Sequence, residues 1–108
     1  MRIRIWSSVL ILGCALTAFG ENSGEALFKS TCVRCHGEDG SARTAAAAKM
    51  KVADLRSDNV QRQSDDELFA SIGHGTRHKQ YPHAFLDRGI SEAQVRGVIA
   101  YIRTLKAK

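Results

Sequence analysis

The sequence has few aromatic residues and almost no regular alternation of apolar and polar residues. Aromatic side chains make up 6% of the chain, which is little for a protein that must build its own core. Alternation is the mark of a half-buried β-strand, so its near absence argues against a strand-built fold. The main apolar run, residues 5–19, is shorter than the ~20 residues that span a bilayer as a helix. These absences favour an all-α protein.

The chain is long enough for one small domain. It has 108 residues, of which 44% are hydrophobic and 25% charged, as is ordinary for a globular protein. Domains below about 70–80 residues usually need a disulfide, a metal or a cofactor to complete their core. Removal of an N-terminal segment brings this chain close to that size, so we expect help of this kind.

Residues 1–20 have the pattern of a secretory signal peptide. Two arginines precede the apolar run, and Ala18 and Gly20 stand at the −3 and −1 positions of a cut before Glu21. We therefore expect a mature domain of residues 21–108, exported to the periplasm or an equivalent oxidising compartment.

Cys14 leaves a second interpretation of this segment open. The letters "ILGC", residues 11–14, resemble the lipobox of a bacterial lipoprotein with Cys14 as the lipidated residue. Against this, the apolar run continues beyond Cys14, where lipoproteins usually turn polar. Retention of the uncut run as an anchor is a further alternative. For the processed chain, membrane association is expected only if Cys14 is lipidated.

The chain is modestly basic. Its formal net charge is +5, which becomes +3 when Arg2 and Arg4 leave with the signal peptide. Because the basic residues are scattered among acidic ones, with no aromatics interleaved, the pattern does not indicate nucleic-acid binding. A basic rim that docks an acidic protein partner is compatible with this charge.

The motif "CVRCH" gathers two cysteines and a histidine within five residues. A disulfide or a thiol redox centre would use the cysteines, but such redox motifs normally follow a strand in an alternating strand–helix chain. A zinc site would need a second ligand pair, for which His74 and His78 are the candidates. Covalent haem attachment uses the whole motif: Cys32 and Cys35 add to the two haem vinyl groups, and His36 becomes the proximal iron ligand.

Three main helices are predicted, over residues 24–37, 64–73 and 91–108. The second and third begin with capping boxes, and the first two end at glycines. The residues that mark these ends are Ser64 with Glu67, Ser91 with Gln94, Gly37 and Gly73. The third helix has one apolar face, made of Val95, Val98, Ile99, Ile102 and Leu105. The alanine run near residue 46 is expected to be a short helix or a loop.

The chain from Gly24 to Leu105 resembles a class I c-type cytochrome of the small bacterial kind. The matching segments are "GEALF" running into "CVRCHG", then "ADL", "SDDELFASIGHG", the proline loop "YPHAF" and "SEAQVRGVIAYIRTL". The resemblance implies the small cytochrome c fold, all-α with three main helices and long loops around one covalently attached haem c. It also implies that the first and last helices cross closely, through Gly24, Phe28, Gly97 and Tyr101.

The resemblance implies single-electron transfer between redox partner proteins, without a substrate of the protein's own, so we do not expect an enzyme. The departure from the family is the sixth iron ligand, commonly a methionine just before the loop proline. Here Tyr81 precedes Pro82, and Met50 comes too early in the chain. The resemblance implies a usual spacing between this ligand and the cap of the final helix, which favours His83, and thus an iron with two histidine ligands, over His78 or Tyr81. The alternative is a haem protein whose sixth site is open or labile and binds small gases or reduces peroxide.

Overall fold

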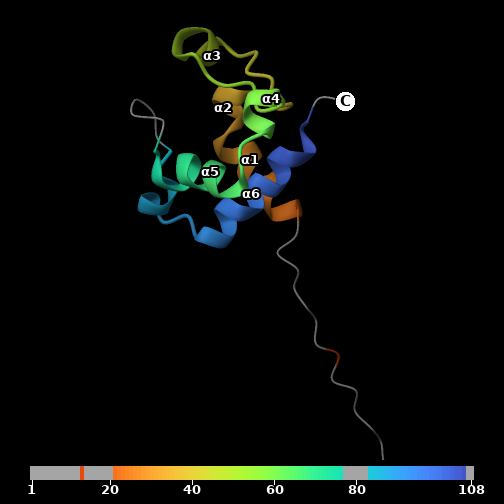
Figure 1. The fold of residues 1–108 in the computed structure, drawn as a ribbon, viewed down its shortest axis with the longest axis vertical. Coiled ribbons are helices and arrows are strands. Elements are labelled where there is room, and N and C mark those ends of the chain that lie inside the picture. The colour runs from red at the N-terminus through yellow and green to blue at the C-terminus, as the bar shows by residue number, and fades with distance from the viewer. Residues whose placement is uncertain (1–12, 14–20, 77–82, 107–108) are drawn as a thin grey trace, which may run out of the picture.

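The structure is a computed structural model that describes residue 13, residues 21–76 and residues 83–106. All regular elements within these ranges are helices, which confirms the all-α prediction. In chain order they are α1 (Glu21–Thr31), α2 (Val33–His36), α3 (Ala45–Met50), α4 (Asp58–Gln61), α5 (Asp65–Phe69), the π-helical turn η1 (Ala70–His74), the 3₁₀ turn η2 (Phe85–Arg88) and α6 (Glu92–Thr104) (Figure 1). Among these helices none combines the length and the apolar character that a membrane span requires.

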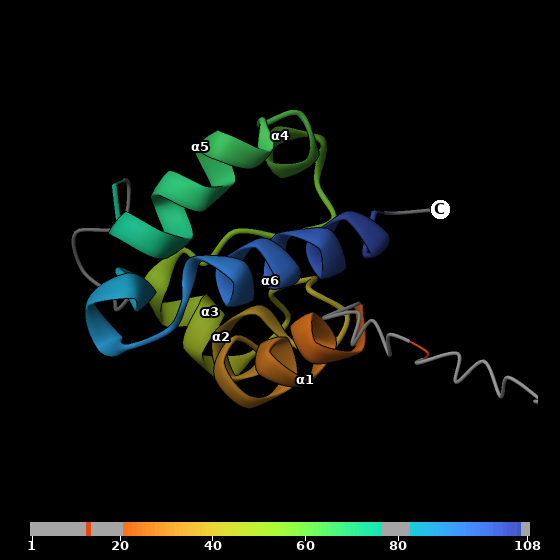
Figure 2. The same cartoon turned by 90° about the horizontal axis from the view of Figure 1, so that it is seen from below.

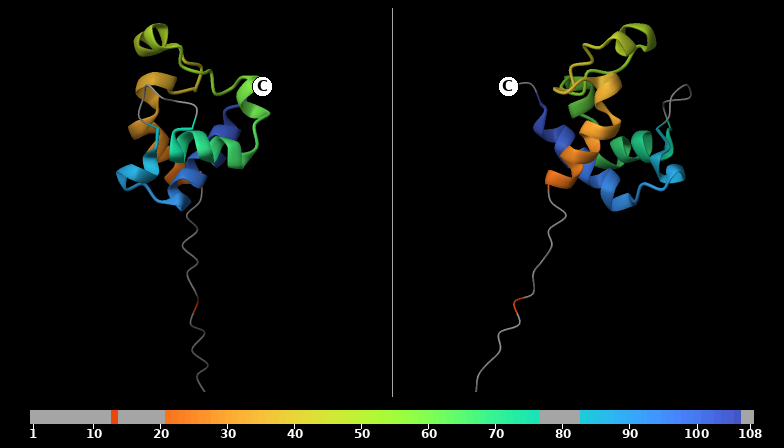
Figure 3. Two further views of the ribbon diagram at one scale, coloured as in Figure 1. Left: turned by 60° about the vertical axis from the view of Figure 1, so that its left-hand side comes forward. Right: turned by 180° about the vertical axis from the view of Figure 1, so that it is seen from behind.

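Helices α1 and α6 cross at the centre of the fold, and α5 lies on the other side of α6 (Figure 2). At the crossing, a methyl group added to Gly24 would overlap the carbonyl oxygen of Gly97. One turn further along, the rings of Phe28 and Tyr101 pack with centroids 5.0 Å apart and planes tilted by 56°. The view from behind shows the two helices directly against each other (Figure 3). The predicted crossing through these four residues is confirmed.

The core is built from aliphatic side chains around one aromatic. Phe28 is fully buried, and it packs in a cluster with branched residues from α4, α5, α6 and the segment before α4. The other members of this cluster are Leu55, Val60, Leu68, Val95, Val98, Ile99 and Ile102. Helix α6 supplies the last four, so four of the five positions predicted for its apolar face are buried and the fifth, Leu105, is half-buried. This helix therefore carries much of the burial that stabilises the domain.

Both predicted capping boxes are present. The Ser64 hydroxyl accepts from the Glu67 amide at 3.1 Å, and the Ser91 hydroxyl accepts from the Gln94 amide at 3.1 Å. Each third residue returns a side-chain oxygen to the amide of its capping serine. These contacts satisfy amides that the first helical turn leaves without partners, which explains why α5 and α6 begin where they do.

The structure corrects one helix end and divides another predicted helix in two. The second main helix continues past Gly73 through the π-helical turn η1 and ends at Gly75, whose φ of 70° is the left-handed conformation of a helix terminator. Gly73 is instead buried, with the Leu86 side chain against it. The first main helix is interrupted at Cys32, so the predicted single segment is α1 followed by the short α2. Its end at Gly37 agrees with the prediction.

Candidate haem site

The short helix α2 presents the cysteine motif at the end of α1. The His36 amide donates to the Cys32 carbonyl at 2.9 Å, which continues the helical path after the interruption. The following loop holds α2 from the other side: the Thr44 hydroxyl donates to the Cys35 carbonyl at 2.7 Å, and the Ala42 amide donates to the His36 carbonyl at 2.7 Å. These bonds fix the backbone of all three motif residues before any cofactor is considered.

Cys32 and Cys35 are free thiols on this turn, and both are half-buried. Burial raises the pKa of the Cys32 thiol, while the Thr31 hydroxyl, 3.4 Å from its sulfur, acts in the opposite direction. Since the ordinary pKa of a cysteine already lies above neutrality, the raised pKa keeps Cys32 in the thiol form at pH 7. Cys32 caps the short helix α2 and Cys35 lies within it, so both sulfurs belong to one helical turn.

The His36 ring is oriented by a backbone carbonyl. Its Nδ1 lies 2.9 Å from the carbonyl oxygen of Ala53. A carbonyl can only accept, so Nδ1 carries the proton of the neutral ring and the lone pair is on Nε2. Metal-binding histidines in proteins are commonly held in this way, because the outer hydrogen bond fixes both the tautomer and the ring direction.

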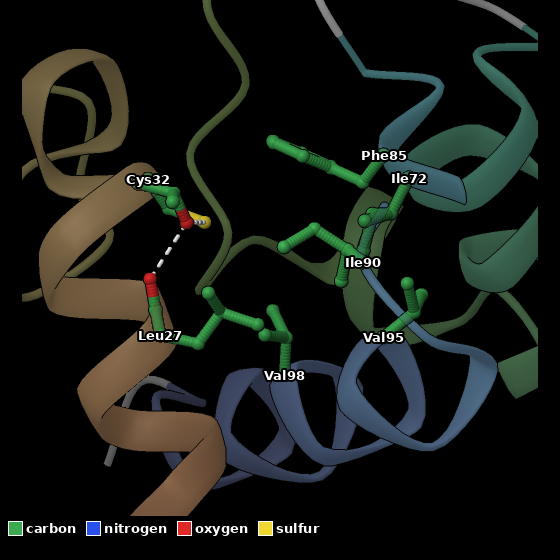
Figure 4. A pocket seen from close by; sticks show the side chains of 8 residues that line it. Leu27, Cys32, Ile72, Phe85, Ile90, Val95 and Val98 are labelled. Carbon is green, nitrogen blue, oxygen red and sulfur yellow. Dashed lines mark hydrogen bonds between the residues drawn. The ribbon is translucent and has the colours of Figure 1, made fainter. Parts of the chain in front are cut away.

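An apolar pocket opens beside Cys32, between α1, η1, η2 and α6 (Figure 4). In Figure 4 the labelled side chains of Leu27, Val98, Ile90 and Phe85 point toward one another across the space. The lining residues are Leu27, Thr31, Cys32, Ile72, Phe85, Ile90, Val95 and Val98. The Thr31 hydroxyl is turned onto the Leu27 carbonyl at 2.6 Å, so the lining is almost wholly apolar.

His83 lies across from His36. The two ring centroids are 6.4 Å apart with planes tilted by 47°, and the His83 ring also meets the edge of Phe85 at 6.0 Å. His74 lies elsewhere, exposed on η1 with its ring at 5.7 Å from Phe69. His78 and Tyr81 lie outside the described residues. Met50 is the last residue of α3 and does not line the pocket.

Two contributors to the site were not identified from the sequence. The Ala53 carbonyl has no sequence signature, because any residue supplies a backbone oxygen. Ile90 has one: it precedes the cap Ser91 and lines the pocket together with Val95, four residues into α6. An apolar pair in these positions is the hydrophobic staple, and this signal could have placed Ile90 in the site.

The residues present fit an iron porphyrin. The apolar pocket beside Cys32 suits a porphyrin ring, Cys32 and Cys35 suit its covalent attachment, and a histidine with its lone pair on Nε2 suits the iron. Zinc was the other metal considered; within residues 21–76 and 83–106, no three His, Cys, Asp or Glu side chains converge as a metal-binding group. A small helical domain with such a pocket has the character of a c-type cytochrome.

Comparison with known families identifies the family of this chain. The family model described as cytochrome c oxidase, cbb3-type, subunit III matches residues 20–102, and the chain belongs to this family of c-type cytochrome domains. Searches of curated proteins and of solved structures return no match to the chain. Membership defines the cofactor as covalently bound haem c with its iron, and the function as electron transfer with redox partner proteins. Domains of this class are typically exported.

Proposed function

We propose that this protein carries single electrons as a monohaem cytochrome whose haem is attached through Cys32 and Cys35 and whose iron is held between His36 and His83. The observation that carries the proposal is the spacing of the two imidazoles. A metal–nitrogen bond of about 2 Å and a ring radius of about 1 Å on each side put the centroids of two opposed ligands about 6 Å apart. The centroids of His36 and His83 are 6.4 Å apart.

The attachment rests on the local geometry of the motif. Cys32 lines the apolar pocket, Cys35 follows one helical turn later, and the intervening backbone is fixed by its hydrogen bonds. The Ala53 carbonyl holds His36 so that Nε2 is the nitrogen for iron. When bound, the haem supplies the one-electron couple between ferrous and ferric iron. The chain's own residues hold the ring, exclude water and orient the imidazoles.

Two histidines in place of a histidine and a methionine have a consequence for the reduction potential. A thioether ligand raises the potential of a c-type haem, so its replacement by His83 lowers the potential relative to His/Met cytochromes. The same arrangement favours the electron carrier, without enzymatic turnover, over a haem protein with an open sixth site for gases or peroxide. A sixth position filled by an imidazole leaves no coordination site for a small ligand until that imidazole leaves.

The partner surface that we propose is the basic region on α2 and α3 beside the attachment turn. Exposed cations outnumber the acidic residues there, Glu38 and Asp39, so an acidic partner protein would be favoured. The cations are Arg34, Arg43, Lys49 and Lys51. Association steered by these charges should slow steeply as ionic strength rises, whereas docking by apolar contact should not.

We propose that the mature protein is residues 21–108, released to the periplasm after removal of the signal peptide 1–20. Mass spectrometry of the exported holoprotein should give the mass of that chain plus one haem. A diacylated N-terminal Cys14 would replace this proposal with that of a lipoprotein carrier anchored at the membrane, with the redox site unchanged.

Two substitutions test the haem assignment. The double variant Cys32→Ala/Cys35→Ala, exported with haem-attachment machinery, should lose its haem to acid-acetone extraction, while the parent keeps it. His83→Ala should convert the ferric protein from low-spin to high-spin in optical and paramagnetic resonance spectra, and His78→Ala should leave it low-spin. A His83→Ala protein that stays low-spin beside a high-spin His78→Ala protein would move the ligand role to His78.

A further inference from the structure

Ala84, which follows His83 directly, has a backbone conformation that is unusual for its residue type. Its φ of 55° and ψ of 39° are left-handed, a region that residues with a Cβ atom rarely adopt. Such a conformation persists where surrounding contacts impose it, and it is common at sites where a side chain must be held in one direction. Gly75 lies opposite this residue.

Gly75, at the end of η1, faces Ala84 with little room for a side chain between them. A methyl group added to Gly75 would lie 3.3 Å from the Ala84 nitrogen and 3.5 Å from its Cβ. A second contact runs beside it, since a methyl group on Gly73 would lie 3.2 Å from Cδ1 of Leu86. The end of η1 therefore packs directly on the start of η2, and the two turns lie side by side in Figure 1.

Both partners in this contact are tied to regular structure. The Thr76 amide and hydroxyl both donate to the Ala70 carbonyl, at 3.2 and 3.0 Å, which closes the end of η1 around Gly75. On the other side, the Ala84 carbonyl accepts from the Asp87 amide at 3.0 Å, which begins η2. The position of Ala84 is thus set by two anchored turns.

We infer that Gly75 and Ala84 are positioning residues for the distal histidine: their close approach sets the direction of His83 and so holds its imidazole opposite His36. This inference rests on the proposed function, in which His83 is the sixth ligand. His83 is one peptide bond from Ala84, so a change in the φ or ψ of Ala84 moves the His83 ring relative to the fixed His36 ring. No contact between Gly75 and the iron is involved.

The test compares Gly75→Ala with Gly89→Ala in the holoprotein. Both glycines have positive φ, 70° and 86°, so alanine introduces a similar backbone penalty at each. Gly89, however, has nothing within 4 Å of an added methyl group. Gly75→Ala should raise the high-spin fraction of the ferric protein and speed carbon monoxide binding to the ferrous protein by about tenfold, the factor that follows from ~1.4 kcal/mol of weaker ligation. Gly89→Ala should leave both at the parent values.

The His83→Ala variant, measured in the same experiments, distinguishes failure of the proposed ligand from failure of the inference. If His83→Ala stays low-spin, the proposed ligand is wrong and the inference falls with it. If His83→Ala becomes high-spin but Gly75→Ala matches Gly89→Ala in spin state and carbon monoxide rate, the ligand stands and the inference is overturned.

A second pair of variants covers the case in which Gly75→Ala does not fold. Ala84→Val puts a branched side chain into left-handed backbone, whereas Ala84→Gly keeps that backbone without penalty. Ala84→Val should speed carbon monoxide binding and Ala84→Gly should not. Equal rates in the two proteins overturn the inference.

Discussion

Gly24 and Gly97 face each other where α1 crosses α6, yet the two glycines are not equivalent. A methyl group at Gly24 would overlap the Gly97 carbonyl, whereas a methyl group at Gly97 would lie 3.6 Å from the Gly24 Cα, an ordinary contact distance. The close approach of the helices therefore depends on the absence of a side chain on α1, and much less on its absence from α6.

Substitution at these two positions should have opposite effects on stability. Gly24→Ala forces the helices apart and should lower the free energy of unfolding by about 1–3 kcal/mol, as overpacking does. Gly97→Ala should be neutral or should raise it by up to about 1 kcal/mol, because alanine is the better helix former. Chemical denaturation of the two holoproteins measures both changes. Equal destabilisation by the two substitutions would contradict the geometry of the crossing.

The Asp54 carboxylate makes the stability of the fold depend on pH. Hydrogen bonds from the Arg56 guanidinium hold the pKa of Asp54 below its ordinary value of 3.8, and the Arg56 amide adds to this at 2.9 Å. A carboxyl group whose pKa is lower in the folded state stabilises that state above its unfolded pKa. The contribution is lost as the pH falls through the folded-state pKa.

Asp54→Asn should accordingly destabilise the protein at pH 7, and its difference from the parent should shrink as the pH falls below about 4. The effect should be modest, since this pair is partly exposed to solvent. Denaturation midpoints measured from pH 7 to pH 2 provide the comparison. In a protein that already carries Arg56→Gln, Asp54→Asn should destabilise the fold less. An unchanged loss of stability there would mean that a group other than Arg56 lowers the pKa of Asp54.

At the scale of elements, the capping boxes define where the two strongest helices begin. Ser91→Ala should lower the free energy of unfolding by about 1 kcal/mol, because it removes the acceptor for the Gln94 amide and starts α6 without a cap. Ser30→Ala is the matched control: the Ser30 hydroxyl is exposed and donates to the Leu27 carbonyl within α1. Removal of the Ser30 hydroxyl should leave the free energy of unfolding unchanged. Denaturation curves in which both variants lose the same stability would count against the cap.

The elements that could be predicted from the sequence are those with local signals. Helices α5 and α6 have a capping serine, a partner three residues later and, in α6, a full apolar face. Helix α4 was missed because four residues with the single cap Ser57 show no periodicity. The end of the second main helix was placed two residues early because Gly73 and Gly75 are both helix terminators by sequence. The structure distinguishes them, because Gly75 has the positive φ of a helix end and Gly73 packs against Leu86.

The residues of the candidate site also differ in how clearly the sequence indicates them. Cys32, Cys35 and His36 are contiguous, so their pattern is visible in one stretch of sequence. The spacing of His83 from His36 depends on the meeting of two distant segments, and counting residues back from a helix cap indicated only which histidine to consider. The Ala53 carbonyl and the left-handed backbone of Ala84 could not be foreseen, since neither depends on the type of side chain.

At the scale of the whole molecule, the proposed haem pocket and the core share side chains. Val95 and Val98 belong to the buried cluster and also line the pocket, and the half-buried Leu27, Ile72, Phe85 and Ile90, which line it too, pack against that cluster. Cys32→Ala/Cys35→Ala protein recovered without haem should therefore have weaker far-ultraviolet helix signal than the holoprotein and should bind a hydrophobic dye.

His83→Ala is the control for this prediction, because it leaves both proposed attachment cysteines in place and should keep its haem and its helix content. A haem-free cysteine variant with the full helix signal and a cooperative unfolding transition would show that the aliphatic cluster around Phe28 is sufficient by itself.

The crossing of α1 and α6 has a consequence for the order in which the chain can fold. Gly24 and Phe28 meet Gly97 and Tyr101 from opposite ends of the domain, so this contact closes almost the longest loop available. The entropy of that closure opposes folding before any burial rewards it, which makes the protein slower to fold than a helical bundle of local contacts. During synthesis the Phe28 ring lacks its Tyr101 partner until α6 has been made.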